Sequence, residues 1–260
     1  MDAWSLYQEF APQPPRILRV DQHYLLYAAR GAMRLEAEGQ SWSLPPARAA
    51  LISAGAPITV TLGQHVTVCS VLFDTGFVPP PAAPLTVFDM SPLARELVLE
   101  CGQWGKGSGA LSPYASQMFL MLATVAWKLA KTPSHAVMPA GRSQAVREIL
   151  RITDAMLAEP LAFDALAARV AMTPRSLSRR LMQELGMSWS QALRRLRMMK
   201  AIEMLASSDE PVTSIAMGVG YASLSAFNAA FREFAGATPT HYRASYRAAT
   251  PQQVTGSPAA

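Results

Sequence analysis

The stretch FDALAARVAMTPRSLSRRLMQELG, residues 163–186, decides the fold of the C-terminal part of the chain. A short first helix is predicted there, and its buried face consists of Leu166, Ala167 and Val170. Thr173 and Pro174 then predict the start of a second helix, because threonine caps helix N-termini and proline at the first helical position gives up no hydrogen bond. The stretch therefore predicts two helices separated by a tight turn.

The second of these helices has an apolar and a polar face. The apolar face is made of Leu177, Leu181 and Leu185, and Gly186 is placed to end the helix. The outward positions are occupied by Arg175, Ser178, Arg179 and Met182. A short helix, a turn and a second helix with an arginine-rich outer face are typical of a helix-turn-helix motif, whose second helix lies in the DNA major groove.

The same pattern returns in SIAMGVGYASLSAFNAAFREFAG, residues 214–236. Phe227, Phe231 and Gly236 each follow their counterparts Leu177, Leu181 and Gly186 by 50 residues. In the first helix of the second copy, the buried positions are Ile215, Ala216 and Val219. They follow the buried positions of the first copy's first helix by 49 residues. The second copy therefore has one extra turn residue, and Ser223 is its candidate N-cap.

A continuous helix is predicted between the copies, in SWSQALRRLRMMKAIEMLASS, residues 188–208, which contains no glycine or proline. About 17 to 20 helical residues span roughly 25 to 30 Å. Successive major grooves on one face of B-DNA lie about 34 Å apart. One chain could therefore read two adjacent major-groove segments.

The charge distribution favours a polyanionic partner for this part of the chain. Residues 1–140 carry nine basic and nine acidic side chains, so the net charge of +5 resides in residues 141–260. Between residues 165 and 200, eight basic side chains face the single acid Glu184. A basic run alone can be a solvated helix surface, so the motifs carry the prediction of nucleic-acid binding.

The N-terminal part is predicted to be rich in β-strands. From residue 23 to residue 74, short runs with partial alternation are interrupted by glycine and proline, which predicts a small β-sandwich or barrel. Two helices are expected over residues 91–103 and 114–131, and they could form a dimer face or pack on their own barrel. Residues 131–142 have the composition of a linker. We therefore expect a domain at 1–130, a DNA-binding domain at 143–247 and a disordered tail at 248–260.

The motifs of the C-terminal part resemble those of the AraC/XylS family of bacterial transcription regulators. The resemblance runs from about Ser143 to Tyr246 and includes the closing TPTHYR at residues 238–243. It implies an all-α domain with two helix-turn-helix motifs, and base-reading positions at Arg175, Ser178, Arg179, Leu224, Ser225 and Asn228. Arginine can pair with guanine and asparagine with adenine through two hydrogen bonds, which supports part of this assignment.

Contacts to the DNA backbone are expected from Thr173, Arg180, Arg194, Arg197 and Arg232. For Arg194 and Arg197, pairing within the protein is an equal alternative. Family members often carry arginine directly after the position of Asn228, where this chain has Ala229. The second recognition helix is therefore expected to contribute mostly positioning, and the first helix most of the specificity.

The N-terminal part resembles the cupin-like sensor domain common in this family, most visibly in SWSLPPARAALISAGAPITV, residues 41–60. Metal-binding cupins carry P-x-G-x-x-H in such a strand pair, and this chain has Ser53 and Ile58 at the proline and histidine positions. Because no two histidines have metal-ligand spacing, we expect no metal. The sequence also lacks a P-loop, a G-x-S-x-G and an H-E-x-x-H motif, so we expect no cofactor and no catalytic residue. The barrel would instead bind a small-molecule effector of unidentified chemistry or mediate dimerisation.

We therefore interpret the chain as a cytoplasmic regulator that binds double-stranded DNA, with RNA polymerase and a second copy of itself as further candidate partners and no membrane association. The start MDAWSLYQEF lacks the features of a signal peptide. Inert buried thiols are the default for Cys69 and Cys101, and redox sensing is the alternative. Two other functions compete with this one. Bound metal would indicate a cupin enzyme with a DNA-binding tail, and aromatic stacking platforms would indicate an RNA-binding protein.

Overall fold

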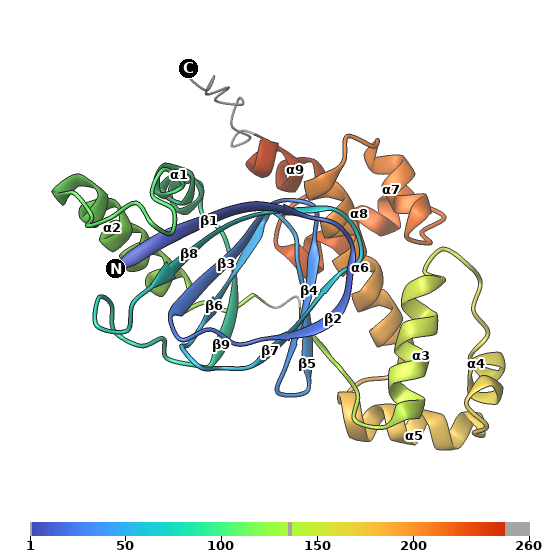
Figure 1. Ribbon diagram of the computed structural model, residues 1–260. Coiled ribbons are helices and arrows are strands. Elements are labelled where there is room, and N and C mark those ends of the chain that lie inside the picture. The colour runs from blue at the N-terminus through green and yellow to red at the C-terminus, as the bar shows by residue number, and fades with distance from the viewer. Residues whose placement is uncertain (1, 135–136, 248–260) are drawn as a thin grey trace.

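The computed structural model describes residues 2–134 and 137–247. A β-rich N-terminal region lies beside a helical C-terminal region, with two helices on the far side of the sheets (Figure 1). No helix in these described residues is long and apolar enough to cross a membrane. The predicted tail at 248–260 lies outside the described residues.

The N-terminal strands form two five-stranded antiparallel sheets. The first sheet contains, in spatial order, β1 (Ala3–Phe10), β8 (Val66–Phe73), β3 (His23–Arg30), β6 (Arg48–Ile52) and β9 (Leu85–Asp89). The second contains β10 (Val137–Pro139), β5 (Gln40–Leu44), β4 (Met33–Ala37), β7 (Ile58–Leu62) and β2 (Gln13–Leu18). This two-sheet arrangement confirms the β-rich prediction for the region.

The expected closed barrel is not what these strands form. Each sheet has two edge strands, β1 and β9 in the first and β10 and β2 in the second, and the sheets pair separately. They pack face to face around an apolar core that includes Leu26, Leu35 and Leu44. This packing buries the apolar strand faces without a continuous ladder around a barrel, so the sandwich that the sequence also allowed is the better description.

The helices α1 (Pro92–Cys101) and α2 (Pro113–Leu129) cover the outer face of the first sheet. Phe119 and Leu122 of α2 are fully buried in a core with Phe73 and Phe88 of the sheet. Because this sheet is covered on both faces, β6 and β8 are buried along their whole length. The helix pair therefore packs on its own sheets, while Met121 remains half exposed.

The predicted linker contains a strand. β10 falls within residues 131–142 and pairs with β5, with Val137 opposite Trp42. The amide of Ala140 continues this pairing by donating to the carbonyl of Gly39 (2.9 Å). A three-residue strand on a sheet edge needs no alternating pattern, which is why the composition of this segment did not reveal it.

The C-terminal region consists of seven helices in the described residues: α3 (Gln144–Ala155), α4 (Phe163–Arg169), α5 (Pro174–Leu185), α6 (Trp189–Ser207), α7 (Val212–Gly218), α8 (Leu224–Ala235) and α9 (Pro239–Arg247). Two apolar cores divide them into two modules. The first module packs α3, α4 and α5 against the start of α6, and the second packs α7, α8 and α9 against its end. α6 is therefore the one helix shared by both modules.

Candidate nucleic-acid interface

The first candidate reader is α5, and its local sequence explains where it begins and ends. The Thr173 hydroxyl accepts a hydrogen bond from the Ser176 amide (3.2 Å), and Pro174 takes the first helical position. Gly186 ends the helix in the left-handed conformation, with φ of 69°. The predicted apolar face is buried, and the predicted base-reading side chains Arg175, Ser178 and Arg179 are exposed.

The second candidate reader, α8, is built in the same way. Ser223 caps it through a bond from the Ala226 amide (3.4 Å), and Gly236 ends it with φ of 71°. Phe227 and Phe231 are fully buried. The predicted readers Leu224, Ser225 and Asn228 are exposed, and Leu224 leaves 40% of its surface accessible.

The side chains expected at the DNA backbone are in three different situations. Thr173, Arg180 and Arg232 are exposed beside the reader helices. Arg194 forms an exposed ion pair with Glu233 of α8, and such surface pairs contribute only about 0–1 kcal/mol. Arg197 turns inward, and its Nε donates to the carbonyl of Leu157 (3.0 Å). For Arg197 the structure therefore shows the intramolecular alternative in place of the expected phosphate contact.

Glu184 has a structural role that the sequence did not reveal. Its carboxylate accepts hydrogen bonds from the backbone amides of Ser143 (2.8 Å) and Arg142 (2.6 Å), at the start of α3. Burial raises the pKa of this carboxyl, but these hydrogen bonds outweigh the effect and leave the pKa below its ordinary value. The acid that stood alone among the basic residues thus ties α5 to α3.

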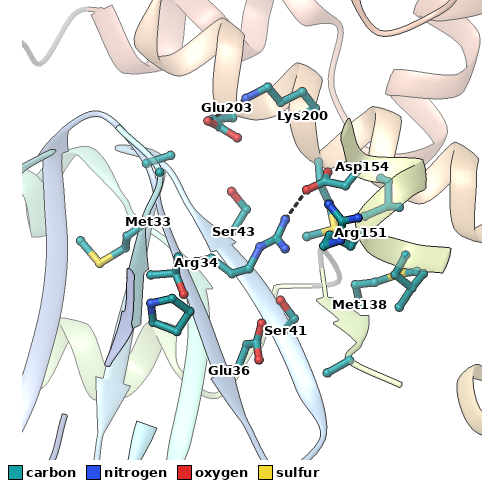
Figure 2. Close-up of a pocket in the computed structure, with 18 of the residues that line it drawn as sticks. Met33, Arg34, Glu36, Ser41, Ser43, Met138, Arg151, Asp154, Lys200 and Glu203 are labelled. Atoms are coloured by element: carbon teal, nitrogen blue, oxygen red, sulfur yellow. Dashed lines mark hydrogen bonds and ion pairs between the residues drawn. The ribbon is translucent and has the colours of Figure 1, made fainter. Parts of the chain in front are cut away.

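A pocket of about 650 Å³ lies between the sheets and the C-terminal helices (Figure 2). Its charged lining is made of the bases Arg34, Arg147, Arg151 and Lys200 and the acids Glu36, Asp154 and Glu203. Its apolar lining includes Met33, Met138, Leu150, Leu196 and Met199. The pocket thus combines an apolar wall with a slight excess of positive charge, and both halves of the chain line it.

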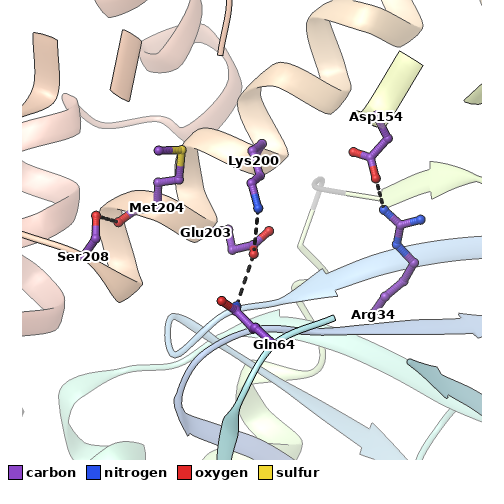
Figure 3. A network of polar contacts seen from close by, with 7 residues as sticks. All are labelled: Arg34, Gln64, Asp154, Lys200, Glu203, Met204 and Ser208. Carbon is purple, nitrogen blue, oxygen red and sulfur yellow. Dashed lines mark hydrogen bonds and ion pairs between the residues drawn. The ribbon is translucent and has the colours of Figure 1, made fainter. Parts of the chain in front are cut away.

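Two sets of polar contacts cross this pocket (Figure 3). Arg34 of β4 pairs with Asp154 of α3 at 2.5 Å. Gln64 donates to Glu203 of α6 (3.2 Å), and the same carboxylate oxygen lies 3.0 Å from the Lys200 ammonium. The first contact joins the sheets to the first module, and the second joins them to the shared helix α6. These are two polar contacts between the sheets and the C-terminal helices, which we call the reader domain (residues 144–247).

A smaller cavity of about 160 Å³ lies between the two sheets. Its lining is mostly aliphatic and aromatic, and includes Trp4, Leu6 and Leu26 together with Arg16 and Tyr24. Burial raises the pKa of the Tyr24 phenol to about 12, so this hydroxyl stays protonated. The cavity therefore suits a small, largely apolar molecule.

Potential metal ligands and cysteine thiols are the remaining groups that could carry chemistry. The described residues contain no cluster of three or more His, Cys, Asp or Glu that could hold a metal ion. Burial raises the pKa of the Cys69 thiol to about 11 and that of Cys101 to about 12. Neither thiol is ionised at neutral pH, which agrees with the inert-thiol prediction.

Comparisons with known proteins give a family match for the helical region and relatives for the chain. Residues 166–245 match the helix-turn-helix domain family. The transcriptional regulator NimR of Escherichia coli K12 is 27% identical over 246 residues, covering 92% of this chain and 87% of that protein. The transcriptional activator RhaS of Escherichia fergusonii is 38% identical over 86 residues, which is 33% of this chain and about a third (31%) of that protein.

Solved structures give similar matches. A transcriptional regulator with an AraC-type DNA-binding domain from Chromobacterium violaceum is 28% identical, covers 38% of this chain and 89% of its own, and has a TM-score of 0.38. ToxT from Vibrio cholerae O395 covers 94% of this chain and 98% of its own at 12% identity and a TM-score of 0.41. The curated relatives named here are transcription regulators, the class of protein predicted for this chain. Taken with the duplicated helix-turn-helix, these matches show that residues 166–245 form a helix-turn-helix domain of the AraC type, similar to those of transcription regulators.

Proposed function

We propose that this protein regulates transcription by reading two adjacent major-groove segments with α5 and α8, under the control of a small-molecule effector. The observation that carries the proposal is the matched pair of helices. Each has twelve residues, a hydroxyl N-cap and a left-handed glycine at its end. The 19 residues of α6 between them span about 28 Å, close to the spacing of successive major grooves.

The two readers would contribute unequally. α5 presents Arg175 and Arg179, each able to make paired hydrogen bonds to guanine. α8 presents Asn228 and the apolar Leu224, which suits contact with a thymine methyl group, and has Ala229 where α5 has Arg179. We expect most of the base discrimination from α5. Arg180 of α5 and Arg232 of α8 would attract phosphates.

The experiment that tests DNA reading is selection of bound duplexes from a random pool by the full-length protein. We expect a motif with two elements about one helical turn apart, and affinity that falls steeply with salt because phosphate contacts release counterions. Absence of enrichment at low salt, together with salt-independent affinity, would contradict the proposal. Enrichment only after addition of a cell extract would point to an effector requirement.

The pocket between the sheets and helices is the candidate effector site. Its apolar wall and its excess of basic side chains suit an amphipathic anion, with the anionic group beside Arg34 or Lys200. An anion there would compete with Asp154 for Arg34 and with Glu203 for Lys200. Because these two pairs lie at the contacts between sheets and reader domain, their rearrangement would change how the reader helices are held.

Thermal unfolding with decanoate, and with decanol as the uncharged control, tests this site. Decanoate should raise the Tm of the wild-type protein more than decanol does. Arg34→Ala should remove the difference, whereas Lys128→Ala, which removes a charge from α2 outside the pocket, should leave it intact. Equal effects of both probes on all three proteins would contradict an anion site.

A cytoplasmic location, contact with RNA polymerase and dimerisation through the exposed side of α2 stay predictions.

A further inference from the structure

We infer that Arg197 is a positioning residue that sets the spacing at which the two DNA elements are read, although it touches neither. This inference rests on the proposed two-groove reading. It concerns the joint between the two modules, where three segments far apart in the sequence meet around one side chain. These segments are the end of the α3 region, the middle of α6 and the turn between α7 and α8.

The contacts of Arg197 join the two modules directly. Its Nε donates to the carbonyl of Leu157, a residue buried in the core of the first module. Its guanidinium lies over the ring of Tyr221, 5.8 Å from the centroid, in the turn of the second module. Tyr221 in turn packs edge-on against Phe227, with ring centroids 5.6 Å apart, at the core of that module. One side chain thus connects the first core to the second.

Gly220 shows how tightly this joint is packed. Its φ of +85° lies in the left-handed region, and a Cβ built there would be 2.4 Å from the Leu157 carbonyl oxygen. The same Cβ would be 2.5 Å from a terminal nitrogen of Arg197. The turn can approach the first module this closely only because residue 220 has no side chain.

A second connection lies on the neighbouring part of α6. Phe234 of α8 packs against both module cores, and the Arg195 guanidinium lies 5.9 Å from the centre of its ring. The two connections leave α5 and α8 little freedom to rotate about α6. If the spacing between the two DNA elements changes by one base pair, one reader helix must shift by about 3.4 Å and rotate by about 34° relative to the other. These values follow from the B-DNA repeat of 34–36 Å, or 10–10.5 base pairs. A locked joint would reject that change.

The test is binding to a duplex library that holds both selected elements constant and varies the spacing between them by one and two base pairs. The wild-type protein should prefer its optimal spacing about tenfold or more over a change of one base pair, comparable with the cost of one mismatched pair. Arg197→Ala should reduce this preference to about threefold or less, and Arg197→Lys should lie between because it keeps a donor but loses the planar group. Base preference within each element should stay unchanged.

Two further variants separate positioning from general damage. Gly220→Ala should broaden the spacing preference in the same way, because its Cβ forces the turn away from Leu157. Lys128→Ala removes one exposed positive charge from α2, away from the joint, and should keep the wild-type spacing profile. Each variant's Tm shows whether it is folded.

The outcomes distinguish this inference from the proposed function. If the wild-type protein selects no two-element motif, the two-groove reading itself is wrong. If it selects the motif, and a folded Arg197→Ala protein binds more weakly at every spacing but keeps the wild-type preference of about tenfold between spacings, Arg197 is merely structural and the inference is overturned.

Discussion

The two helix-turn-helix modules have the same backbone plan but different side chains on both of their faces. In the first module the reader helix buries leucines and exposes arginines, and in the second it buries Phe227 and Phe231 and exposes mostly uncharged groups. The capping hydroxyl and the terminal glycine are kept in both. The positions that specify the fold and the positions that would read DNA are therefore separate, so one can vary while the other is retained.

Position 184 and its counterpart 234 show how this difference reaches beyond the readers. Glu184 caps the start of α3 within the first module, whereas Phe234 packs between the two cores. The first module is thus held partly by polar contacts to its own α3. The second is held by aromatic packing that it shares with its neighbour.

The largest expected effect is on the aromatic core of the second module. Phe231 is fully buried between Phe227 and Tyr242, with ring centroids 5.7 and 5.5 Å away. Phe231→Ala should lower the free energy of unfolding by about 3–5 kcal/mol, and its counterpart Leu181→Ala by about 2–5 kcal/mol. Urea denaturation measures both. A loss below about 1 kcal/mol for Phe231→Ala would show that aromatic packing does not distinguish the second module.

The next effect is on base discrimination. Arg179→Ala should remove about 1–3 kcal/mol of preference at a base pair in one element, because a pair of hydrogen bonds is lost. Asn228→Ala should blur the other element less, since α8 is expected to act mainly in positioning. Competition binding with single-base variants measures both. Equal losses of base preference for the two variants would contradict the proposal that α5 discriminates bases more strongly than α8.

A smaller, pH-dependent effect is expected at Glu184. Because its pKa is below the ordinary value in the folded protein, the carboxylate stabilises the fold at neutral pH, and this contribution is lost as the pH falls through the folded pKa. Glu184→Gln should lower stability by about 1–2 kcal/mol at pH 7 and by progressively less as the pH falls through the lowered pKa of the folded protein. Denaturation at several pH values measures this, with the exposed Glu159→Gln as control. A loss for Glu184→Gln that is independent of pH would rule out the charged cap.

The smallest effect compares the two N-caps. Thr173→Ala and Ser223→Ala each remove one side-chain acceptor at the start of a reader, at a cost of about 1 kcal/mol. The cap bond is 3.2 Å long in the first module and 3.4 Å in the second, so the first substitution should cost slightly more. Amide hydrogen exchange in the first turn of each helix measures the difference. A larger loss at Ser223 would reverse this order.

The features that the sequence predicted best are local ones. Thr173, Pro174 and Gly186 act on backbone groups within a few residues of themselves, so their roles can be read from neighbouring positions. The duplication added a second, independent instance of the same pattern. For the same reason, the burial of Leu177 and Phe227 followed directly from helical spacing.

The features that the sequence did not reveal depend on partners far along the chain. Arg197 bonds to the carbonyl of Leu157, 40 residues away, and a backbone carbonyl leaves no mark in the residue type. Glu184 accepts a hydrogen bond from the amide of Ser143, which lies 41 residues earlier at the start of α3. Whether the strands close into a barrel or form two sheets depends on pairing at the sheet edges, which alternation along single strands does not encode.

The strand β10 determines how far the reader domain can travel from the sheets. While β10 stays paired with β5, the chain from Ala140 to the α3 cap Ser143 reaches only about 10 Å, so the reader domain can pivot but not separate. Release of β10 would extend the free chain back to Ser134, whose amide donates to the carbonyl of Val87 (2.8 Å), giving a reach of about 30–32 Å. The pairing of these three residues therefore sets the length of the tether between the sheets and the reader domain. A short tether keeps the two surfaces at a high effective concentration for each other, and a long tether lowers that concentration.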